Sequence, residues 1–129
     1  MIVLDTCALL WLTLEPDRLS KPAAEMCAGI DALGGYAVSV SLWEIGIKIQ
    51  KGKLDLGMPL SRYVDLVNQV NIVQVPVDTS LWLDSLTLKW PHRDPADRLI
   101  VAFAKRNNLP IVTSDEVIKE LLVVIGWDE

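Results

Sequence analysis

The chain has 129 residues, of which 51% are hydrophobic, and it carries a formal net charge of −5 at pH 7. This length suits one domain with a core of its own, so we predict a single domain over residues 1–129. No apolar run approaches the ~20 residues that cross a membrane, so no membrane-spanning helix is expected. The acidic balance argues against a protein that grips nucleic acid through a broad basic face.

The first half of the chain alternates short apolar runs with helical patterns. In order, we predict a strand over residues 2–5, a helix over 7–14, a helix over 20–33, a strand over 36–40 and a helix over 41–50. Ser20 is the expected N-cap of the second of these helices, with Pro22 in its first turn. A capping box, in which Ser41 is followed by Glu44, predicts where the third helix begins.

The second half continues the alternation. In order, we predict a helix over residues 59–70, a strand over 72–75, helices over 78–89 and 94–106, a strand over 110–113, a helix over 115–122 and a strand over 123–125. Asp94 is the expected N-cap of the helix over 94–106, with Pro95 and Asp97 in its first turn. The strands are apolar throughout and are separated by helices. This pattern predicts an α/β fold with a parallel sheet buried on both faces.

The cysteines and the histidine bear on compartment and metal chemistry. Cys7 and Cys27 lie among apolar neighbours, and the chain shows no export signal, so both are predicted to be buried free thiols. We therefore expect a cytoplasmic protein. His92 is the only histidine, and neither cysteine has a partner at ligand spacing, so a zinc site is not expected.

Carboxylates follow three of the predicted strands. Asp5 closes the first strand, Glu44 lies four residues past the second, and Asp115 lies two residues past the fourth. Asp94 and Asp97 open the helix over residues 94–106. Because the carboxyl ends of parallel strands meet at one edge of the sheet, all five carboxylates are expected to converge there.

Each of these acidic residues also has an ordinary structural interpretation as a helix cap or a first-turn acid. Capping predicts acidic residues at the same edge, so the two interpretations overlap. Charge density favours a site, because crowded carboxylates are costly unless a cation neutralises them. Oxygen ligands without His or Cys suit Mg²⁺ or Mn²⁺. Nearby hydroxyls that can orient a ligand or a water belong to Thr6, Ser39, Thr113 and Ser114.

A serial pattern runs through residues 2–11 (IVLDTCALLW), 39–48 (SVSLWEIGIK), 92–100 (HRDPADRLI) and 111–115 (IVTSD). In this order and at these spacings the segments resemble a PIN domain, and more narrowly the VapC-type toxins of bacterial toxin–antitoxin pairs. The resemblance covers nearly the whole chain. It implies a three-layer fold with a five-stranded parallel sheet flanked by helices. The first strand would be central, with a crevice between the first and fourth strands.

The resemblance also implies an activity, that of an endoribonuclease dependent on Mg²⁺ or Mn²⁺. The acidic quartet of the family maps onto Asp5, Glu44, Asp97 and Asp115. Asp5, Asp97 and Asp115 are the implied metal ligands, and a metal-activated water would hydrolyse the RNA phosphodiester. Glu44 would complete the site through a water or by positioning the nucleophile.

Further residues are expected to assist this site. Asp94 is interpreted mainly as an N-cap with an auxiliary role, and Thr113 or Ser114 as an auxiliary hydroxyl. RNA is expected to contact a modest basic rim made of Arg93, Arg98, Lys48 and Lys51. For Arg98, an ion pair with a neighbouring carboxylate is an equally good interpretation.

The implied partners are RNA, a cognate VapB-type antitoxin and a second copy of the chain in a homodimer. Four of the five tryptophans lie on leucine-rich helical stretches, where core packing is the default: Trp11, Trp43, Trp82 and Trp90. Their number leaves an interface role open for some of them.

Two rival functions are weighed against the nuclease. A phosphatase of the haloacid-dehalogenase kind also begins with a strand ending in Asp, but it needs a second Asp where Cys7 stands. The other rival is a catalytically silent PIN-like module that binds RNA or protein. RNA cleavage with Mn²⁺ distinguishes this module from a nuclease.

Overall fold

The computed structural model describes residues 1–91 and 93–113. Within them, four parallel strands form one sheet in the order β3-β2-β1-β4. The strands are β1 (Ile2–Leu4), β2 (Gly35–Val38), β3 (Ile72–Val75) and β4 (Ile111–Val112). Leu4 of β1 is in register with Ala37 of β2 on one side and with Val112 of β4 on the other. β1 is thus internal to the sheet, and the strand expected over residues 123–125 lies outside the described residues.

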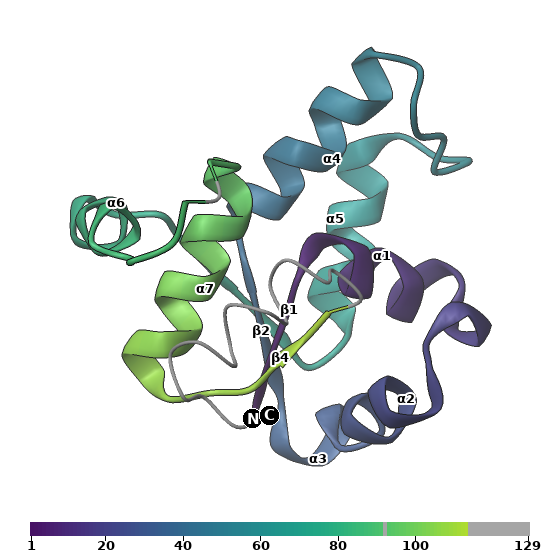
Figure 1. Cartoon of the computed structure of the whole chain (residues 1–129). Helices are drawn as coiled ribbons and strands as arrows, with labels where there is room; N and C mark the ends of the chain where they lie inside the picture. The colour runs from purple at the N-terminus through teal and green to yellow at the C-terminus, as the bar shows by residue number, and fades with distance from the viewer. Residues whose placement is uncertain (92, 114–129) are drawn as a thin grey trace.

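Helices cover both faces of the sheet. They are α1 (Thr6–Leu14), α2 (Lys21–Cys27), α3 (Ile30–Leu33), α4 (Val40–Gln50), α5 (Leu60–Gln69), α6 (Thr79–Leu86) and α7 (Pro95–Asn107), with a 3₁₀ turn at Pro16–Arg18. In Figure 1, α6 and α7 lie on one side of the sheet, while α1, α2, α3 and α5 lie on the other. This is the expected three-layer α/β arrangement. No helix in the described part of the chain is long and apolar enough to cross a membrane.

Two buried clusters hold the layers together, and β1 contributes to both. Val3 packs with Leu99 and Ile100 of α7 on one face of the sheet. Leu4 packs with Leu9 of α1 and Tyr63 of α5 on the other. Because successive strand residues point to opposite faces, an uninterrupted apolar strand is the sequence signature of this doubly covered position.

Two predicted helix ends are wrong. The helix expected over residues 20–33 is divided into α2 and α3, with Gly29 in the turn between them. Glycine has a low helix propensity, which favours the break. The helix expected to reach residue 89 ends at Leu86 instead.

The cysteine prediction is confirmed, since both are free thiols, with Cys27 buried and Cys7 partly buried. The prediction of core packing is wrong for two of the tryptophans. Trp43 is 62% exposed on α4 and Trp82 is 47% exposed on α6. Trp11 and Trp90 are half-buried.

Candidate active site

Asp5 lies at the carboxyl end of β1 and is only 5% exposed. Its Oδ1 accepts a hydrogen bond from the backbone N–H of Ala8 at 2.8 Å, which caps α1. Its Oδ2 accepts a hydrogen bond from the Thr113 hydroxyl, which follows β4, at 2.5 Å. One oxygen of Asp5 therefore serves the helix, and the other is oriented by the neighbouring strand.

Glu44 lies on α4, and the capping box expected to place it there is wrong. The helix begins at Val40, with Ser39 at the N-cap position and no side-chain cap. Ser41 is fully buried inside the helix, and its Oγ lies 2.9 Å from Oγ1 of Thr6. The Ser41 hydroxyl therefore bonds with the Thr6 hydroxyl, and this contact joins α4 to α1. Capping thus no longer explains the carboxylate of Glu44.

The role of Ser41 in joining these helices was missed in the sequence. A signal was present, because Ser41 and Ile45 lie one turn apart on α4 and are both buried. That spacing is typical of a buried helix face, which a small hydroxyl can share with a neighbouring helix.

Asp94 and Asp97 open α7 as predicted. Oδ1 of Asp94 accepts a hydrogen bond from the backbone N–H of Asp97 at 3.0 Å, so the N-cap interpretation of Asp94 is confirmed. Pro95 follows at the first helical position, where its missing N–H costs nothing. The half-buried Asp97 lies in the first turn of the helix.

The Cys7 thiol reports on the electrostatics of this region. Burial raises its pKa, and the negative charges of Asp5, Glu44 and Asp97 raise it further, while Lys48 acts in the opposite direction. Three carboxylates from different elements thus act on one point. The packing agrees, because α4 contacts both α1 and α7.

The donor chemistry was tested against the implied metal. Asp115 and Ser114 lie outside the described residues. Within residues 1–91 and 93–113, no group of three or more His, Cys, Asp or Glu side chains is close enough to hold a metal ion. The carboxylates that the structure does gather around Cys7 are hard oxygen donors, which Mg²⁺ and Mn²⁺ prefer. The type of donor atom therefore suits such an ion, and Asp115, the third implied ligand, lies outside the described residues.

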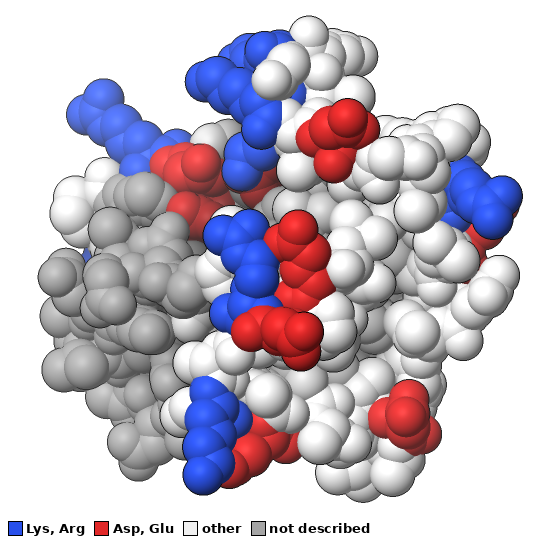
Figure 2. Space-filling model, turned by 90° about the vertical axis from the view of Figure 1, so that its right-hand side faces the viewer, with Lys and Arg blue, Asp and Glu red and all other residues white. Residues whose placement is uncertain are grey.

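The expected basic rim is only partly at the surface. Nζ of Lys48 lies 3.8 Å from Oε2 of Glu44, and the Lys48 side chain is 41% exposed. Lys51 and Arg93 are exposed. Figure 2 shows basic and acidic side chains alternating over one face of the molecule, without a continuous basic surface among the residues described. This pattern agrees with the acidic net charge.

Arg98 is half-buried between α7 and the end of α6, and its expected RNA contact stays a prediction. Its guanidinium donates hydrogen bonds to the backbone carbonyls of Ser85, Leu88 and Trp90, at 2.6 to 3.2 Å. These carbonyls lie at the end of α6 and in the segment that follows it. Arg98 therefore caps α6 from α7, which explains why α6 ends early.

Comparison with known proteins gives two matches. The family model described as "PIN domain" matches residues 2–122. "Ribonuclease VapC22" of Mycobacterium tuberculosis (strain ATCC 25618 / H37Rv) is 30% identical over 115 residues, which cover 88% of this chain and 86% of that protein. No solved structure matches the chain significantly. The family match, over residues 2–122, includes Asp5, Glu44, Asp97 and Asp115.

Proposed function

Since this chain belongs to the PIN-domain family, we propose that it is a metal-dependent endoribonuclease, the toxin of a VapBC-type toxin–antitoxin pair. The observation that carries the proposal is the setting of Asp5. This buried carboxylate sits at the edge of the sheet between β1 and β4, where the strand order reverses. Ligands of open parallel sheets bind at such switch points.

Asp5, Asp97 and Asp115 are the proposed metal ligands. A Mg²⁺ or Mn²⁺ ion, when bound, supplies an activated water and neutralises charge on the scissile phosphate. Asp5 is held in place for this task by Ala8 and Thr113, because each of its oxygens accepts one of their hydrogen bonds. A preoriented ligand loses less freedom when it binds an ion.

Glu44 and Lys48 form a second pair at the same site. Lys48 lies one turn after Glu44 on α4, and its ammonium group provides a positive charge next to the Glu44 carboxylate. We propose that Glu44 positions the attacking water and that Lys48, with Lys51 and Arg93, contacts RNA phosphates. Asp94 acts as the cap that fixes Asp97, and it takes no part in ligation.

The proposed protein partners are an antitoxin and a second copy of the chain. The resemblance to VapC-type toxins implies an antitoxin partner, so we propose a cognate VapB-type antitoxin for this chain. A homodimer is proposed as well. It is supported by three exposed apolar side chains on α6, which are Trp82, Leu83 and Leu86. The protein would act in the cytoplasm, where RNA and antitoxin are synthesised.

The test is RNA cleavage by the purified, antitoxin-free protein with Mn²⁺ or Mg²⁺. Cleavage is expected to stop with EDTA and in Asp5→Asn. Asparagine caps helices as well as aspartate does, so Asp5→Asn is expected to fold. Asp78→Asn is the matched control, because Asp78 caps α6 through the same bond to the backbone, from its Oδ1 to the N–H of Leu81 at 2.8 Å. It should keep full activity.

A protein that neither cleaves RNA nor binds a divalent ion would contradict the proposal. RNA or antitoxin binding without cleavage would favour the silent PIN-like module. Equal loss of activity in Asp5→Asn and Asp78→Asn would assign the effect to folding. The setting of Asp5 would then no longer support the nuclease proposal.

A further inference from the structure

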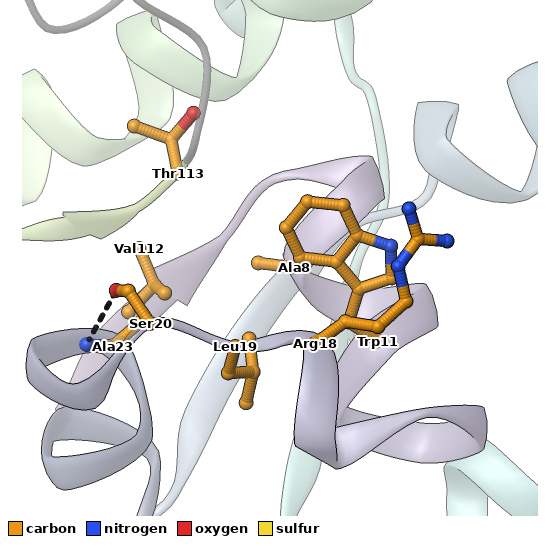
Figure 3. A pocket seen from close by; sticks show the side chains of 8 residues that line it. All are labelled: Ala8, Trp11, Arg18, Leu19, Ser20, Ala23, Val112 and Thr113. Carbon is orange, nitrogen blue, oxygen red and sulfur yellow. Dashed lines mark hydrogen bonds between the residues drawn. The ribbon is translucent and has the colours of Figure 1, made fainter.

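A pocket of about 260 Å³ opens beside Asp5, at the carboxyl end of β4 (Figure 3). Side chains from α1, from the segment after it and from the end of β4 line it; they include Ala8, Trp11, Arg18, Leu19, Val112 and Thr113. We name it the Trp11 pocket. Its lining is mainly apolar, with the hydroxyls of Ser20 and Thr113 and the Arg18 guanidinium as polar groups.

The position of the Trp11 pocket ties it to the candidate metal site. Thr113 lines the pocket and donates its hydrogen bond to Asp5. Ala8 also lines it, and its backbone N–H binds the other oxygen of Asp5. Both residues that orient Asp5 are therefore walls of the pocket. The Trp11 pocket is therefore next to the carboxylate of Asp5.

Trp11 gives the pocket a planar wall, and the Arg18 guanidinium stacks against the indole. The centre of the Arg18 guanidinium lies 5.0 Å from the centroid of the indole. Figure 3 shows the indole drawn between this guanidinium and the Val112 and Thr113 side. Nη1 of Arg18 also lies 3.1 Å from Oε2 of Glu15, a bond that holds the guanidinium in place. Indole and guanidinium planes are the surfaces on which unpaired RNA bases stack.

Size and charge select the ligand. Pockets for drug-sized ligands measure roughly 300–1,000 Å³, so this smaller space suits a single ring system. The guanidinium complements the phosphate that accompanies such a ring in RNA. We propose that the Trp11 pocket binds one unpaired base of the RNA substrate, next to the scissile phosphate. This inference rests on the proposed function and deepens it, because it assigns a base-binding subsite beside Asp5.

The test combines abasic RNA with variants. Once the cleavage position is mapped, oligonucleotides with one abasic nucleotide at successive positions are compared with the intact RNA. We expect one position near the cut to lose kcat/KM by about 5- to 150-fold, the range for one stacked base. Trp11→Leu should lose a similar factor on intact RNA and show no further loss on the abasic RNA. Trp11→Phe should recover most of the loss.

Val73→Ala is the control for an apolar surface substitution away from the pocket, because Val73 is 50% exposed on β3, at the edge of the sheet opposite β4. It should behave as the wild type toward every oligonucleotide. Arg18→Gln guards against a folding defect of Trp11→Leu, since the Arg18 side chain is 61% exposed. We expect Arg18→Gln to weaken RNA binding in a salt-dependent way without lowering Tm.

Binding of the same oligonucleotides in EDTA, measured by fluorescence anisotropy, separates the two proposals. Without cleavage, abasic-sensitive binding that disappears in Trp11→Leu would overturn the nuclease and keep the base subsite. An equal abasic effect in the wild type and Trp11→Leu would overturn the subsite and leave the nuclease standing. The subsite would also be overturned if Trp11→Leu cleaved RNA like the wild type but was inhibited less by the antitoxin. That result would mark the pocket as a protein-docking site.

Discussion

Thr113 donates a hydrogen bond to Oδ2 of Asp5 although the two residues lie 108 positions apart in the chain. The sheet register brings them together. Leu4 pairs with Val112, so Asp5 and Thr113 are the next residues on neighbouring strands. The backbone supports the same alignment, because the N–H of Asp5 donates to the carbonyl of Val112 at 3.3 Å. The orientation of the candidate metal ligand is therefore set by the pairing of β1 with β4.

Removing this hydroxyl is expected to weaken the metal site without unfolding the protein. Thr113→Val keeps the shape of the side chain, but Oδ2 of Asp5 loses its donor. We predict a loss of about 10- to 100-fold in Mn²⁺ affinity or in kcat/KM, the range for groups that orient a metal ligand.

Thr113→Ser is the control, because it retains the hydroxyl and should keep most of the activity. Mn²⁺ titration and RNA cleavage are measured on both variants, with Tm as the check on folding. If Thr113→Val and Thr113→Ser have the same Mn²⁺ affinity, the hydroxyl plays no part in holding the ligand.

The elements and the local caps were predictable from the sequence. Asp5 and Asp94 cap their helices as expected, since a cap depends only on residues within one turn. The three-layer arrangement was predictable for a related reason, because doubly buried strands leave a continuous apolar pattern.

Long-range polar contacts were not predictable in the same way. Ser41 has the local pattern of a cap, yet its hydroxyl bonds with Thr6, which is 35 positions away. Arg98 lies beside a predicted ligand, yet its guanidinium binds carbonyls of the preceding helix and the segment that follows it. In both cases the side chain bonds with a group that is distant in the sequence, in place of a nearby backbone group or solvent. The residues around Ser41 and Arg98 in the sequence do not indicate these partners.

Arg98 is expected to matter for stability more than for RNA affinity. Arg98→Met leaves the carbonyls of Ser85, Leu88 and Trp90 without this donor. Hydrogen bonds from a charged group stabilise by about 1.5–3 kcal/mol each but do not add fully, so we predict a loss of about 2–4 kcal/mol in unfolding free energy. Urea denaturation measures this value.

Arg106→Met is the matched control on the same helix. Arg106 pairs with Asp84 at the surface, where an ion pair contributes about 1 kcal/mol or less. An Arg98→Met protein as stable as Arg106→Met would contradict the capping role. A reduced salt slope of RNA binding in folded Arg98→Met would instead restore the phosphate contact expected from the sequence.

Asp94 is expected to act as a cap and not as a ligand. Asp94→Ala removes the acceptor for the N–H of Asp97 and should lower the unfolding free energy by about 0.5–2 kcal/mol. Asp94→Asn keeps the acceptor, so we predict near wild-type stability and activity. RNA cleavage and urea denaturation are measured side by side. A loss of activity in a stable Asp94→Asn protein would show that the negative charge itself is needed.

Tyr63 is expected to make the fold sensitive to alkali. Its side chain is fully buried, and its hydroxyl lies 2.8 Å from Oγ1 of Thr13. Burial raises the pKa of Tyr63 above its usual value, against the smaller effect of the hydrogen bond with Thr13. The unfolded chain therefore releases this proton first as pH rises. The contribution of Tyr63 is complete below its unfolded pKa of about 10 and is lost as pH rises toward the higher folded pKa.

The prediction is a steeper fall of unfolding free energy above about pH 10 in the wild type than in Tyr63→Phe, by up to about 1.4 kcal/mol per pH unit. At neutral pH, Tyr63→Phe should cost about 1 kcal/mol, because the bond with Thr13 is lost. Burial also raises the pKa of Cys27, whose loss of stability has the same sign but begins nearer pH 9. Comparing urea denaturation of the two proteins cancels that shared part. Parallel curves above about pH 10 would mean that Tyr63 releases its proton over the same pH range in the folded and unfolded states, and that the alkaline loss has another source.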